Sequence, residues 1–184
     1  MEYKKDFIDI AHKILTRRAD NAFTDIDLYV ISSIQRLIKL HEGFETLTRN
    51  HNYEAAIPLL RLMLDSCMRL IAVSIASDPQ KVINAFFEEK NIGKIRNIDG
   101  TFLSDGYLKE QLDKIEPGVA DTYNTLSSYI HLSGTHFISL RGKDKRLCIG
   151  GNNLSHDKEL VKSANDGQRK ILSLAIKLLI TYLL

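Results

Sequence analysis

Three charged residues recur at four-residue intervals in the segment 53–77: Arg61, Asp65 and Arg69. On an α-helix they fall within one strip about 80° wide, and almost all of the remaining surface of that helix is apolar. Two guanidinium groups held by a carboxylate could bind an anionic ligand, because guanidinium pairs strongly with phosphate and carboxylate. The alternative is a ladder of ordinary ion pairs, worth roughly a few tenths of a kcal/mol each.

A second polar series, Tyr123, Ser127 and His131, recurs at the same interval in the segment 119–140. We expect it to share one polar pocket with the charged strip, where His131 would be the titratable member and Tyr123 a hydroxyl donor at the edge. The alternative leaves His131 simply exposed. No third residue can be assigned to orient the imidazole, so a Ser–His hydrolase is not predicted.

The elements that position these two polar series are predicted to be helices, because apolar residues recur at helical spacing along most of the chain. This spacing predicts an all-α bundle of six to seven helices in a single domain, 1–184. A loop insertion at about 141–154 precedes the C-terminal helix. The predicted helices cover about 3–19, 24–49, 53–77, 79–90, 104–115, 119–140 and 155–184, with an irregular connection at 91–103.

Several helix starts carry recognisable capping residues. Thr24 and Asp27 have the spacing of a capping box, and Asp78 followed by Pro79 is typical of an N-cap and the first helical position. Pro58 lies too deep in its helix for a first-turn proline, so we expect either a kink or a later start there.

Composition limits the classes of protein. The chain has 184 residues, of which 44% are hydrophobic and 26% charged, which suits one domain with a sizeable core. Its net charge of +2 does not by itself indicate nucleic-acid or membrane-surface binding. Cys67 and Cys148 are isolated, so neither a disulfide framework nor a zinc site is predicted, and we expect a reducing cytoplasm and no metal or cofactor.

Neither end of the sequence indicates a membrane or secreted protein. The start, MEYKKDFIDI, lacks an apolar signal core. The apolar stretch at 171–184 has only 14 residues and includes Lys177, whereas a membrane span needs about 20. We therefore predict that it is a core helix.

Two stretches resemble a bacterial helical family of unknown function: AAIPLLRLMLDSCMRL (55–70) and YNTLSSYIHLSG (123–134). Its members pair an A…LLR-S-x-x-E helix with a later Y…LS-x-Y-x-H-x-S helix. The matching positions are Arg61, Asp65 (where Glu is more usual), Tyr123, Ser127 and His131. Families of this shape are compared with the HEPN superfamily, which includes dimeric, metal-independent ribonucleases of toxin–antitoxin and phage-defence systems. The resemblance implies a HEPN-like bundle with a regulatory or defence-associated role.

The sequence motif typical of HEPN proteins is an Arg followed after four to six residues by a His. Arg36 and His41 match this motif, with Leu37 at the position where Asn is common. The resemblance implies that His41 would act as acid/base and that Arg36 would stabilise phosphate charge. On a regular helix, however, these side chains are about 140° apart, and His41 falls on the apolar face. We therefore predict a buried, hydrogen-bonded His41.

The leading interpretation is a cytoplasmic binding module with a pocket for an anionic ligand. A metal-independent ribonuclease and a structural oligomerisation domain are the alternatives. A second copy of the chain or another protein is the expected partner, RNA is a candidate partner, and no membrane is expected. The predicted ligand-binding residues are Arg61, Asp65, Arg69, Tyr123, Ser127 and His131.

Overall fold

A computed structural model describes residues 2–17, 23–131, 134, 136, 140 and 157–183. These residues form seven α-helices and no β-strand, which confirms the predicted all-α class. The loop insertion expected at 141–154, with Cys148, lies outside the described residues. The helices are α1 (Glu2–Thr16), α2 (Asp25–Arg49), α3 (Tyr53–Ile75), α4 (Pro79–Phe87), α5 (Asp105–Ile115), α6 (Val119–Ser127) and α8 (Lys158–Leu183), with a 3₁₀ turn, η1 (Ile92–Lys94), between α4 and α5.

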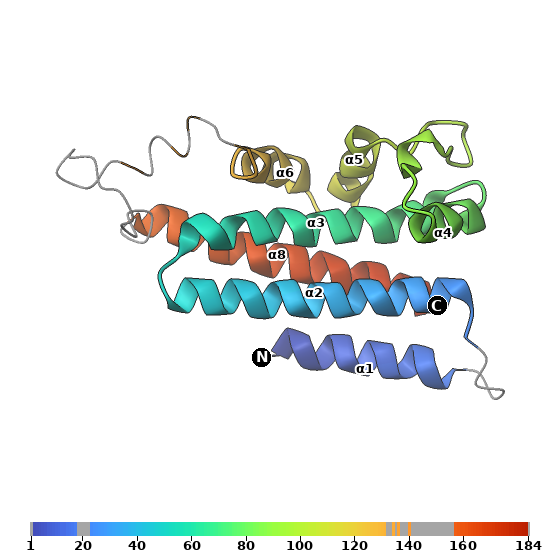
Figure 1. The fold of residues 1–184 in the computed structure, drawn as a ribbon, viewed down its shortest axis with the longest axis horizontal. Coiled ribbons are helices and arrows are strands. Elements are labelled where there is room, and N and C mark those ends of the chain that lie inside the picture. Colours follow the sequence, from blue (N-terminus) through green and yellow to red (C-terminus); the bar gives the residue numbers. More distant parts are fainter. Residues whose placement is uncertain are drawn as a thin grey trace.

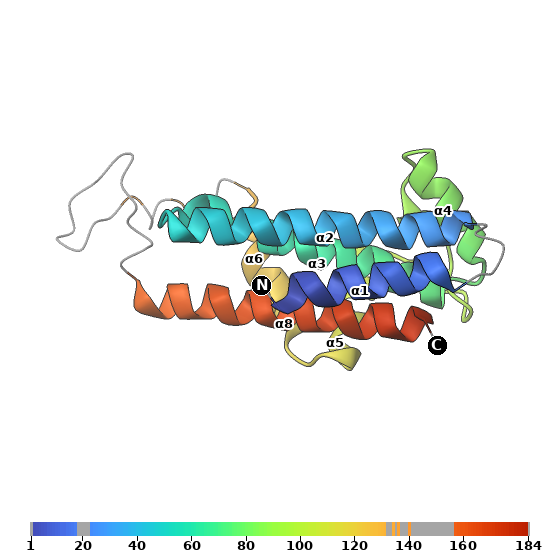
Figure 2. The same ribbon diagram turned by 90° about the horizontal axis from the view of Figure 1, so that it is seen from below.

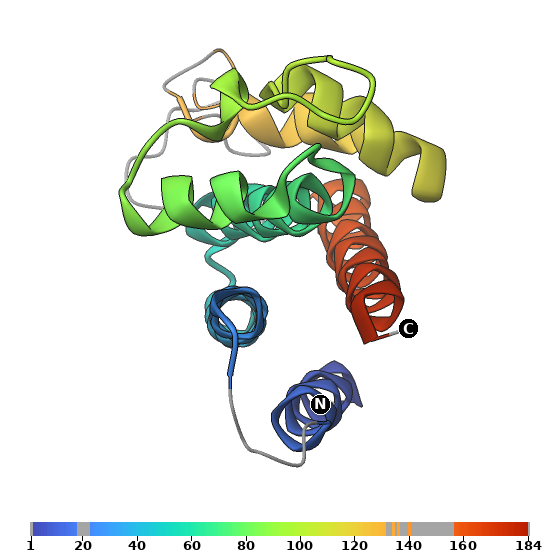
Figure 3. The same ribbon diagram turned by 90° about the vertical axis from the view of Figure 1, so that its right-hand side faces the viewer.

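Helix α3 is the centre of the molecule. It packs against α2 and α8 on one side and against α5 and α6 on the other, and α4 packs beside its C-terminal end (Figures 1 and 3). Helix α1 completes the bundle by packing on α2 and α8 (Figure 2), on the opposite side of the molecule from α5 and α6 (Figure 1). The central place of α3 follows from its sequence, because a helix that is apolar around most of its circumference must be covered on most sides.

The capping residues begin the helices where the sequence predicts. Thr24 and Asp27 form the expected capping box: Asp27 N donates to Thr24 Oγ1 at 3.2 Å and Thr24 N donates to Asp27 Oδ2 at 2.9 Å. Asp78 caps α4 by accepting from Gln80 N at 3.1 Å. Helix α3 begins at Tyr53, so Pro58 does not delay its start.

Helix α8 is a core helix, as predicted. Its buried face packs against α3 and α1 and consists of Ile171, Leu172, Leu174, Ala175 and Leu179 together with Ala164 and Gln168. Asp157 caps its start by accepting from the backbone N–H groups of Glu159 and Leu160, both at 3.0 Å. Within the described parts of the chain, no helix is long and apolar enough to cross a membrane.

The helix expected over 119–140 is shorter than predicted. Helix α6 ends at Ser127, and residues 128–130 form a turn. In this turn the backbone N–H groups of Ser128, Tyr129 and Ile130 donate three residues back instead of four, at 3.1–3.3 Å, and the Ser128 hydroxyl donates to Thr125 O at 2.7 Å. This tightened, side-chain-assisted turn ends the helix without a Gly or Pro to mark it.

Candidate functional site

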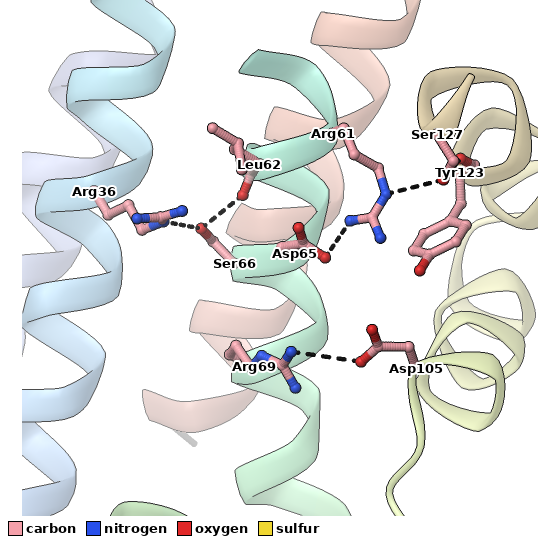
Figure 4. Close-up of polar contacts among 9 residues, drawn as sticks. All are labelled: Arg36, Arg61, Leu62, Asp65, Ser66, Arg69, Asp105, Tyr123 and Ser127. Carbon is pink, nitrogen blue, oxygen red and sulfur yellow. Dashed lines mark hydrogen bonds and ion pairs between the residues drawn. The ribbon is translucent and has the colours of Figure 1, made fainter. Parts of the chain in front are cut away.

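The charged strip of α3 divides between two places. Arg61 points toward α6, Arg69 points toward the start of α5, and Asp65 lies between them (Figure 4). On the side facing α2, Arg36 reaches Ser66 of α3 (Figure 4). The strip therefore has one end closed by α6 and another end that borders a groove.

The closed end is the Arg61 cluster, made of Arg61, Asp65, Tyr123 and Ser127. Arg61 is only 8% exposed and pairs with Asp65 one turn along α3. Its Nε donates to Ser127 Oγ at 3.2 Å, and its guanidinium carbon lies 3.7 Å from the centroid of the Tyr123 ring. A buried guanidinium is costly unless it is neutralised and hydrogen-bonded, and here both conditions are met.

The other two predicted ligand residues lie outside this cluster. His131 is exposed beyond the end of α6, and it makes none of the contacts that hold Arg61. The early end of α6 explains this, because His131 no longer follows Ser127 by one helical turn. Arg69 instead approaches Asp105 at the start of α5, with 3.4 Å between Arg69 Nη2 and Asp105 Oδ1.

The open end of the strip borders a groove of about 1050 Å³ between α2, α3, α4 with the loop that follows it, and the start of α5. We call it the cationic groove. Its cationic lining residues are Arg36, Arg69, Lys90 and Lys94, and its acidic ones are Asp65, Glu89 and Asp105.

The loop that borders this groove, expected to be irregular, is fixed by a buried amide. Asn97 donates from Nδ2 to the Tyr107 hydroxyl at 2.6 Å and accepts from Thr101 N at 2.7 Å. Isolated bridges join Asn97 to Ala76 and Arg96 to Phe102. The groove wall formed by the 3₁₀ turn is therefore anchored to the ends of α3 and α5.

The cations of the groove differ in how they are paired. Arg69 has its distant contact with Asp105, and Lys90 pairs with Glu88 at 2.6 Å. Arg36 and Lys94 have no carboxylate within ion-pair distance in the described part of the chain. The Arg36 Nε donates to Ser66 Oγ at 3.2 Å, which orients the guanidinium with a neutral partner and leaves its terminal N–H groups available.

The predicted burial of His41 is confirmed. The side chain is 7% exposed, and its Nδ1 lies 2.8 Å from the Gln168 amide nitrogen on α8. Burial lowers the pKa of His41 from its usual value of 6.5. Arg36 reaches toward α3 while His41 contacts α8, so the two residues of the HEPN-like spacing face different neighbours within this chain.

A further polar cluster surrounds Asp27, and the sequence predicted only its capping box with Thr24. Asp27 is 1% exposed and pairs with Arg17. It also accepts from the Thr24 hydroxyl at 2.7 Å and the Tyr182 hydroxyl at 3.0 Å. Burial alone would raise the pKa of Asp27, but the hydrogen bonds from Thr24, Tyr182 and Arg17 outweigh it and lower the pKa to about 2. We call this group the Asp27 clamp, because it joins the end of α1 and the end of α8 to the start of α2.

Among the described residues, no three His, Cys, Asp or Glu side chains lie close enough together to bind a metal ion. Cys67 is fully buried in α3, and burial raises the pKa of its thiol to about 12. Comparison of the chain with protein-family profiles, with curated proteins and with solved structures gives no match, so the HEPN resemblance stays a prediction.

Proposed function

We propose that this protein is a binding module that holds an anionic ligand in the cationic groove. The observation that carries the proposal is Arg36, whose guanidinium lines the groove and is oriented by the hydroxyl of Ser66 rather than by a carboxylate. An unneutralised guanidinium with free N–H donors is suited to bind phosphate or carboxylate oxygens.

The surrounding charges support this choice. Of the three acidic side chains in the groove, Asp65 is already paired with Arg61, and Asp105 lies near Arg69. Only Glu89 has no cation within ion-pair distance in the described chain. The groove therefore has a net positive charge that can attract an anion, and Lys94 contributes to this charge together with Arg36.

The Arg61 cluster does not fit this role. Its guanidinium is neutralised by Asp65 and covered by the Tyr123 ring, so an incoming anion would have to displace contacts that are already made. We assign Arg61, Tyr123 and Ser127 to holding α6 on α3, and we keep Asp65 and Arg69 as residues bordering the ligand. A cytoplasmic, regulatory role is part of this proposal, as the isolated cysteines and the HEPN resemblance suggest.

The direct test is calorimetric titration with inorganic tripolyphosphate. We expect saturable binding to the wild-type protein and a loss of affinity of roughly tenfold or more in Arg36→Ala, because a charge-assisted hydrogen-bonding group is removed. The matched control is Arg49→Ala, which removes the same charge from an exposed arginine at the C-terminal end of α2, away from the groove.

The two variants separate a specific site from general attraction. Equal losses in Arg36→Ala and Arg49→Ala would show only that the overall charge attracts the polyanion. Absence of binding to the wild-type protein would contradict the proposal.

A further inference from the structure

We infer that the ligand of the cationic groove is a nucleotide, whose base stacks on Phe86 while its phosphates bind Arg36. This inference rests on the proposed function and adds the chemical class of the ligand. The phosphates account for the cations, and the base accounts for the exposed surface of an aromatic side chain that lines the groove.

Phe86 lines the groove and is 46% exposed. Its ring meets the buried ring of Tyr29 edge-to-face, with centroids 4.9 Å apart, and it contacts Phe87 with centroids 5.4 Å apart. Tyr29 is itself fixed, because its hydroxyl donates to Arg69 O at 3.0 Å. The groove thus presents an aromatic ring that is held in place and has open surface, as a base-stacking site requires.

The spacing between this ring and the cation suits a nucleotide. Tyr29, against which Phe86 packs, and Arg36 are seven residues apart on α2, which separates them by roughly 10 Å along the helix axis. That span is comparable to the distance between the base and the outer phosphates of a nucleoside diphosphate or triphosphate. Ser32 also lines the groove on the intervening stretch of α2, where a hydroxyl can meet the sugar or the first phosphate.

Simpler anions would use only part of this arrangement. An inorganic phosphate or a carboxylate would bind Arg36 and leave Phe86 exposed to water. A free nucleotide and a nucleotide within single-stranded nucleic acid offer the same base and phosphate chemistry, so the experiment must distinguish these two sources.

The experiment compares inorganic tripolyphosphate, ATP and a single-stranded adenylate decamer by calorimetry, without divalent cations. We expect ATP to bind the wild-type protein about tenfold more tightly than tripolyphosphate, since stacking adds to the phosphate contacts. Phe86→Ala should abolish that difference and leave the affinity for tripolyphosphate within about twofold. Phe86→Tyr, which retains the ring, should retain the preference for ATP.

Phe23→Ala is the matched control, because Phe23 is 49% exposed but does not line the groove. It should change no affinity by more than about twofold. Tighter binding of ATP than of the decamer, per site, would support a free nucleotide; the reverse order, with the same loss in Phe86→Ala, would support single-stranded nucleic acid.

The failures of the two proposals differ. If tripolyphosphate and ATP bind equally and Phe86→Ala has no effect, the nucleotide inference is overturned while the anion groove stands. If no probe binds, the anion groove itself is overturned.

Discussion

Arg61 belongs to α3 and Arg36 reaches the same helix from α2, yet their surroundings are opposite. Arg61 is buried between α3 and α6, neutralised by Asp65 and covered by the Tyr123 ring. Arg36 is exposed on α2, and within the described residues its one hydrogen-bond partner is the Ser66 hydroxyl. A charge that is fully partnered within the chain contributes to the fold, whereas a charge with a neutral partner remains available to a ligand.

The same distinction holds elsewhere in the molecule. The Asp27 clamp belongs with the Arg61 cluster, because its buried carboxylate is satisfied by Arg17, Thr24 and Tyr182. Lys94 belongs with Arg36, since it lines the groove without a carboxylate partner in the described chain. The comparison therefore predicts large stability changes at the closed clusters and small ones in the groove.

The largest effect should come from Asp27→Ala. Removing this carboxylate leaves Arg17 and the Tyr182 hydroxyl without their shared acceptor, and we expect the free energy of unfolding to fall by about 3 kcal/mol at pH 7. Urea unfolding followed by circular dichroism measures this. A loss below about 1 kcal/mol would show that the clamp is not the closed structure described.

The Asp27 clamp also has a pH signature. Its folded pKa of about 2 lies below the usual 3.8, so its contribution to stability is present above pH 3.8 and is lost as the pH falls toward 2. Asp27→Asn cannot titrate. The difference in unfolding free energy between wild type and Asp27→Asn should therefore narrow between pH 5 and pH 2.

The contrast between the closed Arg61 cluster and the open groove is tested most directly by comparing the stability losses of Asp65→Ala and Arg36→Ala. Asp65→Ala strands the buried Arg61 guanidinium and should lower the free energy of unfolding by about 2 kcal/mol, less than for a fully buried pair because Asp65 is partly exposed. Arg36→Ala should cost under about 0.5 kcal/mol. Equal effects in the two variants would break the comparison.

A double variant separates burial from pairing at the same place. Replacing both partners, as in Arg61→Met with Asp65→Leu, should recover most of the stability that Asp65→Ala loses, since neither charge then remains unpaired. A double variant as unstable as Asp65→Ala would assign the effect to packing against α6.

A small, pH-dependent effect should come from His41. Because its folded pKa is lowered, the unfolded chain takes up a proton first as the pH falls below 6.5, so stability decreases by under about 1 kcal/mol in that range. His41→Gln, which can still hydrogen-bond Gln168, should flatten this dependence between pH 7.5 and 5.5. His12→Gln, at an exposed position, is the control and should leave the pH dependence of stability unchanged. Thermal unfolding of both variants at each pH measures this.

Much of the fold could be predicted because helix starts depend on local chemistry. Thr24 with Asp27, Asp78 with Pro79, and Ser104 mark the beginnings of α2, α4 and α5 through residues that lie within four positions of each other. The end of α6 could not be predicted, because a turn stabilised by the Ser128 hydroxyl leaves no distinctive residue in the sequence.

The candidate site was predictable only in part, for a related reason. Arg61 and Asp65 share one helix, so their contact follows from spacing, and the resemblance joined them to Tyr123 and Ser127. The contacts of Arg36 with Ser66 and of Phe86 with Tyr29 span 30 and 57 positions. Such contacts depend on how α2, α3 and α4 align, which periodicity does not specify.

The central position of α3 also has a consequence for hydrogen exchange. Because α3 is covered by five other helices, its amide protons can reach solvent only when most of the bundle unfolds, so they should exchange slowest. Helix α4, with two exposed phenylalanines, lies at the margin and can open locally. The groove therefore has one wall that stays fixed and one that can separate, and a ligand that bridges them should slow exchange in α4 far more than in α3.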